Sequence, residues 1–282
     1  MVSVFNEVLG RDVAVPDRPV RIVSLSPALT ETLFMLGLGE RVIGVSAFCA
    51  RPEGARAKRK VGSYSTTNND LLKEMKPDLI LAITGYQREL ALRMSTEFPV
   101  YPITLPVSVA GIVDMVVKLG LVVGETEKAR ELSARLIREL APSRPTGRRL
   151  SAYVEIDLGG PVAFGAYSYI TDALHFLGAS TLFDDVRSEW LTPDLSRVAS
   201  ENPDVIFYEA KMYSKFGQQD LERLIDKRGW RNLDAISRGC CFLAPGPLDF
   251  LAHHGPSFIT DSIPWLSEKL DIAAGKDVGK HP

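Results

Sequence analysis

Six aromatic side chains stand just past predicted strands or in loops between predicted elements. Aromatic rings offer broad apolar faces, and a tyrosine hydroxyl adds a polar contact at the edge. Several such rings around one hollow suit a large flat ligand such as a macrocycle. Ordinary packing beneath a long loop is the alternative for each ring. The predicted set is Phe48, Tyr64, Tyr86, Phe164, Tyr167 and Trp190.

Histidine placement separates the classes of ligand. The four histidines are His175, His253, His254 and His281, so the first half of the chain has none. A bare Zn²⁺ or Mn²⁺ shared by two halves would draw imidazoles from both, which argues against a carrier of free metal. His253 and His254 can hydrogen-bond a ligand amide or the backbone, or coordinate cobalt or iron axially. We predict no metal site made by the protein alone.

Signatures of catalysis are missing from the sequence. It has no Walker phosphate loop, no Gly-x-Ser-x-Gly elbow and no convincing Cys/His pair. The three cysteines, Cys49, Cys240 and Cys241, suit small buried hydrophobes rather than a disulfide framework. We therefore predict a binding protein that is not an enzyme and has no intrinsic cofactor.

The bulk composition is that of an ordinary globular protein. Hydrophobic residues make up 45% and charged residues 24% of 282 residues, and the net charge is −2. This charge argues against nucleic acid as a partner. No apolar run approaches the roughly 20 residues that cross a bilayer, and no export signal is visible. We expect an extracytoplasmic protein, periplasmic or at the cell surface, if a signal was removed, and a cytoplasmic one if the chain is native as written.

The elements that must position these residues follow one order twice. LKEMKPDLILA at 72–82 and VASENPDVIFY at 198–208 share a helical approach, Pro-Asp and an apolar run of strand length. The residue before proline disfavours helix, so each helix ends there and a buried strand follows. Pro77 and Pro203 stand 126 positions apart. The predicted strands are residues 21–26, 41–46, 79–83 and 100–105, then 150–156, 205–210 and 240–245, with a Gly-rich loop after residue 156.

Strands that alternate with helices indicate parallel sheets covered by helices. Residues 126–140 predict one long helix between the halves, with Thr126 as its cap and Pro142 beyond its end. We predict an α/β fold of two lobes, each a parallel sheet flanked by helices, joined by a single long helix, with a ligand cleft between the lobes. The predicted limits are 1–124 for the N-terminal lobe, 125–145 for the linker helix and 146–282 for the C-terminal lobe.

This layout and the opening LGRDVAVPDRPVRIVSLSPALTETLFMLGLGERVIGVS resemble the helix-linked (class III) substrate-binding proteins of ABC importers. That family carries cobalamin, ferric siderophores or haem to a membrane permease, and the resemblance covers about residues 9–270. The chain looks most like the cobalamin-binding branch, on four aromatics and one acid at matching offsets. These are Phe48, Tyr64, Phe164, Trp190 and Asp249.

The sequence departs from that branch at two positions. His253 stands where the family has an arginine, and Ile83 where it has a tryptophan. These departures leave another corrinoid or a different large macrocycle open as the ligand. The ligand-binding residues that we predict are Phe48, Tyr64, Tyr86, Phe164, Tyr167, Trp190, Asp249 and His253.

The resemblance implies a monomeric substrate-binding protein that holds a corrinoid, cobalamin in the first place, between its lobes. It would deliver this ligand to an ABC permease dimer with its ATPase subunits. One alternative is a ferric-siderophore or haem carrier, in which Arg88, Lys211 and Lys215 meet anionic groups. Another is a cytosolic corrinoid-binding or handover protein on the same fold, or an enzyme with an accessory metallocofactor.

The resemblance also implies a docking surface. In the family, an acid at the start of each Pro-Asp helix pairs with permease arginines. The first helix has Asp70, whereas the second has Ser196 at the matching place and Asp194 two residues earlier. We predict that Asp70 and Asp194 dock the permease. For Asp70 the alternative is a favourable interaction with the helix dipole alone.

Overall fold

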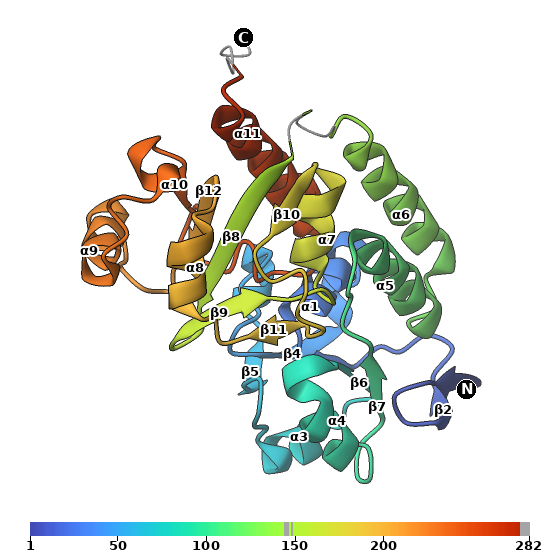
Figure 1. Ribbon diagram of the computed structural model, residues 1–282. Coiled ribbons are helices and arrows are strands. Elements are labelled where there is room, and N and C mark those ends of the chain that lie inside the picture. The colour runs from blue at the N-terminus through green and yellow to red at the C-terminus, as the bar shows by residue number, and fades with distance from the viewer. Residues whose placement is uncertain (144–146, 148, 277–282) are drawn as a thin grey trace. The chain divides into compact units, whose positions relative to one another are not determined.

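The computed structural model describes residues 1–143, 147 and 149–276 (Figure 1). Tertiary contacts divide the chain into two compact units. Unit 1 holds Met1–Pro106 and Ala110–Arg138, and unit 2 holds Val107–Val109 and the chain from Glu139 onward. Each unit has a sheet flanked by helices, so the predicted α/β class is confirmed.

The sheet of unit 1 has five parallel strands in the order β5-β4-β3-β6-β7. Four of them were predicted, and β5 is the addition. It begins with two charged, exposed residues, so the sequence has no apolar run there. The strand is defined by its pairing with β4. The strands are β3 (Ile22–Ser24), β4 (Val42–Ser46), β5 (Arg59–Gly62), β6 (Leu79–Ile83) and β7 (Val100–Ile103).

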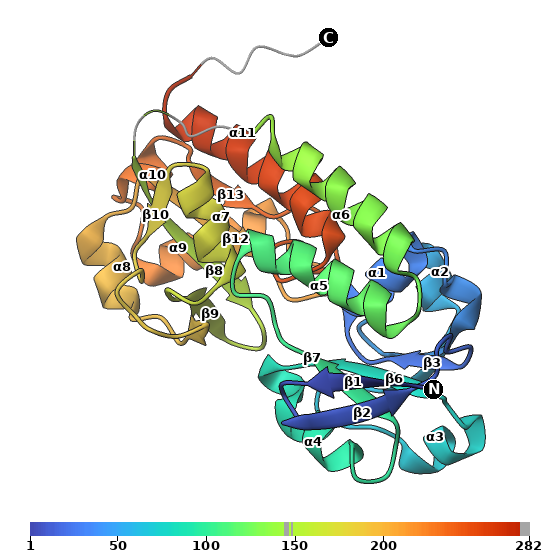
Figure 2. The same ribbon diagram turned by 90° about the vertical axis from the view of Figure 1, so that its right-hand side faces the viewer.

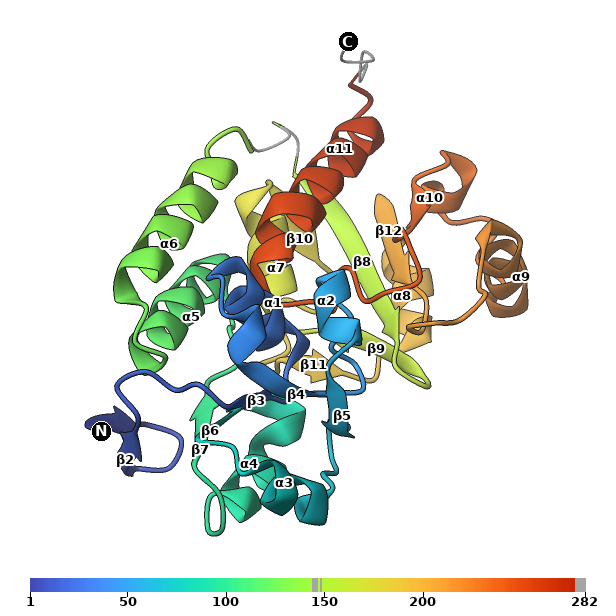
Figure 3. The same ribbon diagram turned by 180° about the vertical axis from the view of Figure 1, so that it is seen from behind.

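Helices cover the sheet of unit 1 because alternate strand residues point to opposite faces. Buried side chains of α3 and α4, such as Leu72 and Leu90, form one core with Val23 and Ile80 of the sheet. Figure 3 shows α1 on the other face. The helices are α1 (Pro27–Met35), α2 (Glu53–Arg56), α3 (Asn69–Met75), α4 (Arg88–Met94) and the 3-10 turns η1 (Gly39–Arg41) and η2 (Gly85–Gln87).

Helices α5 (Val109–Val122) and α6 (Thr126–Leu140) pack tightly on each other. Ala129 of α6 lies so close to Gly120 of α5 that a side chain at position 120 would overlap with it. The nearly buried Glu125 accepts from Arg41 at 3.0 Å and lies 3.0 Å from Lys128 Nζ. Helix α6 begins and ends at the predicted residues, and its residues up to Arg138 belong to unit 1. The predicted domain limits stay a prediction, and the boundary at 145 and 146 lies outside the described residues.

A hairpin that the sequence pattern did not predict opens unit 1. Strands β1 (Val2–Asn6) and β2 (Arg11–Val15) pair antiparallel. The buried Asn6 donates from Nδ2 to the Pro102 carbonyl at 2.8 Å, and the Tyr101 hydroxyl donates to the Phe5 carbonyl at 3.1 Å. Both contacts attach the hairpin to β7, beside which it lies in Figure 2.

The sheet of unit 2 is mixed. Strands β10, β8, β12 and β13 are parallel neighbours, whereas β9 runs antiparallel to β8 and β11 antiparallel to β9. The prediction of a Gly-rich loop after residue 156 is therefore wrong for residues 161–164, which form β9. The strands are β8 (Leu150–Asp157), β9 (Pro161–Phe164), β10 (Ala179–Thr181), β11 (Trp190–Leu191), β12 (Val205–Glu209) and β13 (Cys241–Leu243).

Strand β12 shows how the helices cover this sheet. Ile206 and Tyr208 join the core formed with α8 and α9, while the Phe207 ring meets Trp265 of α11 with centroids 5.6 Å apart. The helices are α7 (Tyr169–Phe176), α8 (Leu195–Glu201), α9 (Gln218–Arg228), α10 (Asp234–Ser237), the π turn η3 (Phe258–Ser262) and α11 (Ile263–Ala273). None of the described helices is long and apolar enough to cross a membrane.

The repeated Pro-Asp phrase has the same structure in both units. Helices α3 and α8 each begin after a capping side chain, Asn68 or Asp194, and each ends at a left-handed residue. Those end residues, Lys76 and Asn202, both have φ 46°. A left-handed residue before proline stops the helix and turns the chain into the next strand.

The aspartate of the phrase ties that strand to its neighbour. The Asp78 carboxylate accepts from the backbone N–H groups of Val20 at 2.8 Å and Arg21 at 2.9 Å, just before β3. The Asp204 carboxylate accepts from the N–H of Ser151 at 2.9 Å and from its hydroxyl at 3.1 Å, in β8. Each aspartate thus fixes where two adjacent parallel strands begin.

Asp204→Ala should lower the stability of the protein, because the Ser151 N–H and hydroxyl lose a charged acceptor in a partly buried position. We expect a loss of about 1–3 kcal/mol in the free energy of unfolding, measured by urea denaturation. Glu131→Ala, at an exposed position of α6, is the control and should change little. Equal stability of both variants would show that Asp204 does not tie the strands.

Candidate functional site

Two of the predicted aromatic residues form a stack in unit 1. The rings of Phe48 and Tyr64 lie 4.4 Å apart between centroids, with 23° between their planes. Phe48 follows β4, and its N–H donates to Ser46 Oγ at 3.3 Å. Tyr64 stands on a turn closed by the N–H of Ser63, which donates to the Thr66 carbonyl at 2.8 Å. Both rings are half-buried.

Unit 2 carries a second aromatic group. Trp190 of β11 and Phe164 of β9 are directly opposite in the antiparallel pair, where side chains of one face contact each other. Both are half-buried, and Tyr167, three residues after Phe164, is 53% exposed. Phe164 was predicted to lie in a loop, and the structure places it at the end of a strand. A partly exposed aromatic group of this kind is typical of a binding surface.

One ring of each group occupies the corresponding place in the repeat. Tyr64 and Trp190 stand 126 positions apart, the same interval that separates Pro77 from Pro203. Each ring therefore precedes its Pro-Asp helix by the same number of residues. The prediction that Tyr64 and Trp190 contact one ligand stays a prediction.

Tyr86 lies in η2, directly after β6, and its side chain is outside the described part of the structure. Its neighbour Gln87 is buried and fixes this strand end. The Gln87 side chain accepts from the Ile83 N–H at 3.1 Å and donates to the Leu25 carbonyl at 2.8 Å. Sequence reasoning missed Gln87, because only tertiary packing reveals that a glutamine after a strand is buried.

The late segment that carries Asp249 and His253 is held by a buried acid. Glu209, the last residue of β12, is 4% exposed and accepts from the backbone N–H groups of Leu251 and Ala252. From the other side, the Tyr169 hydroxyl donates to the Leu251 carbonyl at 2.8 Å. Glu209 is a second residue that the sequence pattern did not indicate.

His253 has a structural neighbour that the prediction did not include. Its side chain is 1% exposed, and Nδ1 lies 3.6 Å from the Asp249 carboxylate. This separation is longer than a hydrogen bond. The burial argues against direct contact of His253 with a ligand. His175, the histidine of α7, pairs with Asp184 at 2.8 Å. Among the described residues, no three His, Cys, Asp or Glu side chains gather into a group that could hold a metal ion.

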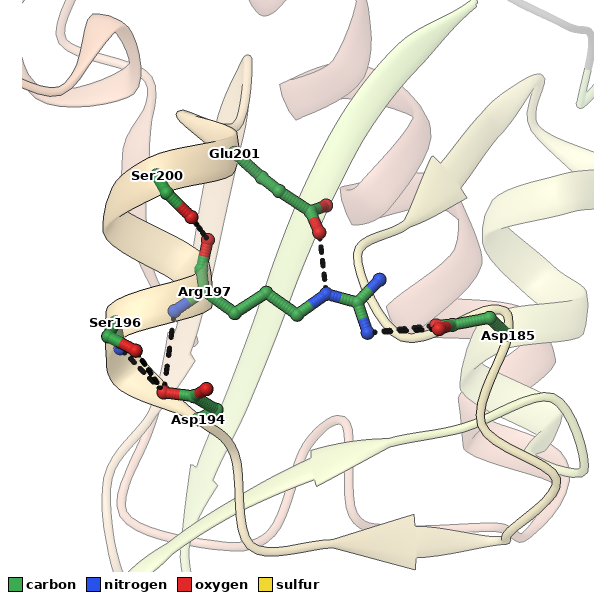
Figure 4. Close-up of polar contacts among 6 residues, drawn as sticks. All are labelled: Asp185, Asp194, Ser196, Arg197, Ser200 and Glu201. Atoms are coloured by element: carbon green, nitrogen blue, oxygen red, sulfur yellow. Dashed lines mark hydrogen bonds and ion pairs between the residues drawn. The ribbon is translucent and has the colours of Figure 1, made fainter.

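The predicted docking residue Asp194 caps α8. Figure 4 shows its carboxylate turned back onto the start of the helix. Oδ1 accepts from the Ser196 N–H at 2.9 Å, the Ser196 hydroxyl at 2.6 Å and the Arg197 N–H at 3.4 Å. These hydrogen bonds, the Ser196 hydroxyl first, lower the pKa of Asp194. Asp194 thus corresponds to the cap Asn68 rather than to Asp70, which lies exposed in the first turn of α3.

Arg197 is held beside this cap by acids on both sides. Its Nε donates to Glu201 at 2.5 Å and its Nη1 to Asp185 at 2.9 Å (Figure 4). The guanidinium also lies 5.0 Å from the ring centre of Phe183. Arg197 therefore partly neutralises the acidic surface around Asp194.

The structure also shows the basic residues that would meet an anionic ligand such as a ferric siderophore or haem. Arg88 is exposed and pairs with the adjacent Glu89 at 3.2 Å, and Lys211 and Lys215 are exposed in unit 2. A groove of about 350 Å³ in unit 1 lies between residues 65–69 and α4. It contains none of the predicted ligand-binding residues, although Tyr64 immediately precedes it in the chain.

Glu209 should make stability depend on pH. Burial, and then repulsion from Asp249, raise the pKa of this carboxyl from 4.5 to about 7 against the opposing effect of the Leu251 N–H. The folded protein then binds more protons than the unfolded chain between these values. The contribution of Glu209 to the free energy of unfolding is fully present below pH 4.5 and is lost as pH rises through 7. The free energy of unfolding falls by roughly 3 kcal/mol over this range.

Glu209→Gln should remove most of this dependence of the free energy of unfolding on pH, because an amide does not titrate. The measurement is urea denaturation at pH 5, 6, 7 and 8, with Glu131→Gln as the exposed control that keeps the slope of the parent protein. An unchanged pH dependence in Glu209→Gln would show that Glu209 is ionised throughout this range.

Comparison with known proteins gives the family. Residues 22–247 match the model of the periplasmic binding protein family. The vitamin B12-binding protein of Yersinia pseudotuberculosis serotype O:3 (strain YPIII) is 26% identical over 191 residues, 66% of this chain and 68% of that protein. The vitamin B12 binding protein BtuF of Vibrio cholerae superimposes with a TM-score of 0.71 at 21% identity, over 90% of this chain and 98% of that one. The haem-binding protein RhuT of Roseiflexus sp. RS-1 gives 0.75 at 20%, with the same coverage. Because the family model spans most of its length, the chain belongs to the periplasmic binding protein family.

Proposed function

We propose that this protein is the substrate-binding protein of an ABC importer and that its ligand is a corrinoid, cobalamin in the first place. The observation that carries the proposal is a half-buried aromatic group in each unit, with Tyr64 and Trp190 at equivalent places of the repeat. Phe48 and Tyr64 form one, and Phe164 and Trp190 the other. The identity of relatives named for vitamin B12 or cobalamin supports the same ligand.

The chemistry of a corrinoid suits these residues. The macrocycle offers broad apolar area to aromatic rings, and its rim of amide arms offers N–H donors. Asp249, whose side chain is 12% exposed, supplies a carboxylate acceptor that lies 3.6 Å from Nδ1 of the buried His253. We propose that Asp249 meets the amide rim, with His253 in support of it rather than at the ligand.

A ferric siderophore or haem is the second candidate ligand. A solved structure similar in fold is described as haem-binding, and Lys211 and Lys215 are exposed cations in unit 2. Anionic ligands need such cations, whereas the amide rim of a corrinoid needs acceptors such as Asp249. Incubation of the pure protein with cobalamin, cobinamide, haem and a ferric siderophore decides between them. The colour retained after desalting identifies the ligand by its spectrum.

We propose further that the protein acts by binding and docking, with no bond made or broken and no resident cofactor. The partner would be an ABC permease dimer with its ATPase subunits, and the protein itself a monomer in an extracytoplasmic compartment. A handover role for the same corrinoid inside the cell remains the alternative, and a permease gene beside the native gene would favour transport.

Trp190→Ala should weaken cobalamin binding by about 2–4 kcal/mol, the range of aromatic anchors in interfaces, with little loss of fold. Isothermal titration gives the affinity and circular dichroism the fold. Phe176→Ala, which removes an exposed aromatic ring from α7 in the same unit, is the control and should bind normally. A folded Trp190→Ala protein with unchanged affinity would remove Trp190 from the site.

Charge removal at the helix starts should separate docking from ligand binding. Asp194→Asn keeps an acceptor for the cap, as Asn68 does in α3, while it removes the charge. We expect Asp70→Asn and Asp194→Asn together to reduce uptake through the cognate permease and to leave corrinoid affinity intact. Asp114→Asn, on the exposed side of α5, is the control. Normal uptake by the double variant would rule out docking through these acids.

A further inference from the structure

The segment that carries the aromatic group of unit 2 passes unusually close to its neighbour. Gly165 directly follows Phe164, and a Cβ atom at this glycine would lie 2.5 Å from the Val186 carbonyl oxygen and 2.6 Å from that of Ser188. Both are backbone atoms, which cannot swing aside as a side chain can. The φ angle of Gly165 is outside the left-handed region. Space alone therefore requires glycine here.

The close approach lets two backbone hydrogen bonds form. The N–H of Ala166 donates to the Val186 carbonyl at 2.8 Å, and that of Tyr167 donates to the Ser188 carbonyl at 3.1 Å. The buried Thr171 hydroxyl donates to the Gly165 carbonyl at 2.8 Å. Two backbone hydrogen bonds thus join residues 164–167 to residues 186–190, beside the paired Phe164 and Trp190.

A glycine does the same for the aromatic stack of unit 1. A Cβ atom at Gly62 would lie 2.9 Å from Thr67 Cα and closer still to the Thr66 carbonyl oxygen. The Gly62 carbonyl accepts from the N–H of Ala47 at 2.8 Å. Gly62 therefore contacts both segments of the stack, since Ala47 precedes Phe48 and Thr66 closes the turn that carries Tyr64.

We propose that Gly62 and Gly165 are positioning residues that preorganise the two aromatic groups for the ligand. The inference rests on the proposed function, in which these rings bind a corrinoid. Rings fixed before binding lose little freedom when the ligand arrives, so rigid support raises affinity without any new contact. A rigid aromatic surface also favours a rigid flat ligand over a flexible one.

The test compares Gly165→Ala with Gly160→Ala. Gly160 is exposed in the same unit, has no atom within 4 Å of an added Cβ and is outside the left-handed region, so alanine fits there. We expect Gly165→Ala to weaken cobalamin binding about tenfold or more, which is 1.4 kcal/mol or more, and Gly160→Ala to bind normally. Gly62→Ala should weaken binding to a similar extent.

A double variant distinguishes positioning from a general structural effect. In the Trp190→Ala background, Gly165→Ala should cost less affinity than it does in the parent protein, because one of the two rings that it displaces is absent. Full additivity of the two losses would overturn the proposal, and so would normal affinity of Gly165→Ala. Should Gly165→Ala fail to fold, Thr171→Val removes the hydroxyl that holds the same segment and should weaken binding with the same non-additivity.

A readout without ligand separates this inference from the proposed function. The chain has three tryptophans, and the spectrum of Trp190 is the difference between the parent protein and Trp190→Ala. Gly165→Ala should shift that fluorescence, and Gly160→Ala should leave it unchanged. If no corrinoid binds but the shift occurs, the proposed ligand is wrong and the positioning role stands. If cobalamin binds and the Trp190 spectrum is the same in the parent protein, Gly165→Ala and Gly160→Ala, the positioning role is wrong.

Discussion

The sheets of both units depend on one interaction, in which the carboxylate of a Pro-Asp phrase accepts N–H groups at the start of the adjacent strand. Asp78 does so for β3 and Asp204 for β8. Since parallel strands run in one direction, their carboxyl ends lie at the same edge of the sheet. Ligand-binding loops of parallel sheets follow those ends. The segments that carry Phe48, Tyr86 and Asp249 all come directly or shortly after strands of these sheets.

Acidic groups in this protein serve support roles that differ with burial. Asp194 is exposed, and the hydrogen bonds of its cap favour the charged form. Glu209 likewise accepts hydrogen bonds from backbone N–H groups, those of Leu251 and Ala252. It lies inside unit 2, where burial disfavours its charged form. Hydrogen bonds from backbone N–H groups and loss of water thus act in opposite directions on one carboxyl. At Glu209 the loss of water prevails, and the support of the late segment becomes sensitive to pH near neutrality.

Much of the architecture could be predicted from the sequence because the signals are local. Cap, apolar spacing and stop residues of α6 all lie within residues 126–142, and the prediction of its limits is confirmed. The helices α3 and α8 followed from Pro77 and Pro203 for the same reason. The hairpin of β1 and β2 and the short strands β9 and β11 were not predicted. Two to five residues carry little periodicity, and pairing with a distant strand defines these elements.

The sequence by itself determined the family resemblance, the repeat and the types of residue at the candidate site, because these depend on identity and spacing along the chain. Only the tertiary structure decided what those residues contact. Phe48 stacks on Tyr64, and Phe164 lies opposite Trp190. His253 is buried beside Asp249, and Glu209 accepts from the backbone of the late segment. Burial and close backbone approach are properties of packing between distant segments. A glycine that must be glycine, or a glutamate whose pKa is about 7, is therefore recognised only when the neighbouring segments are in place.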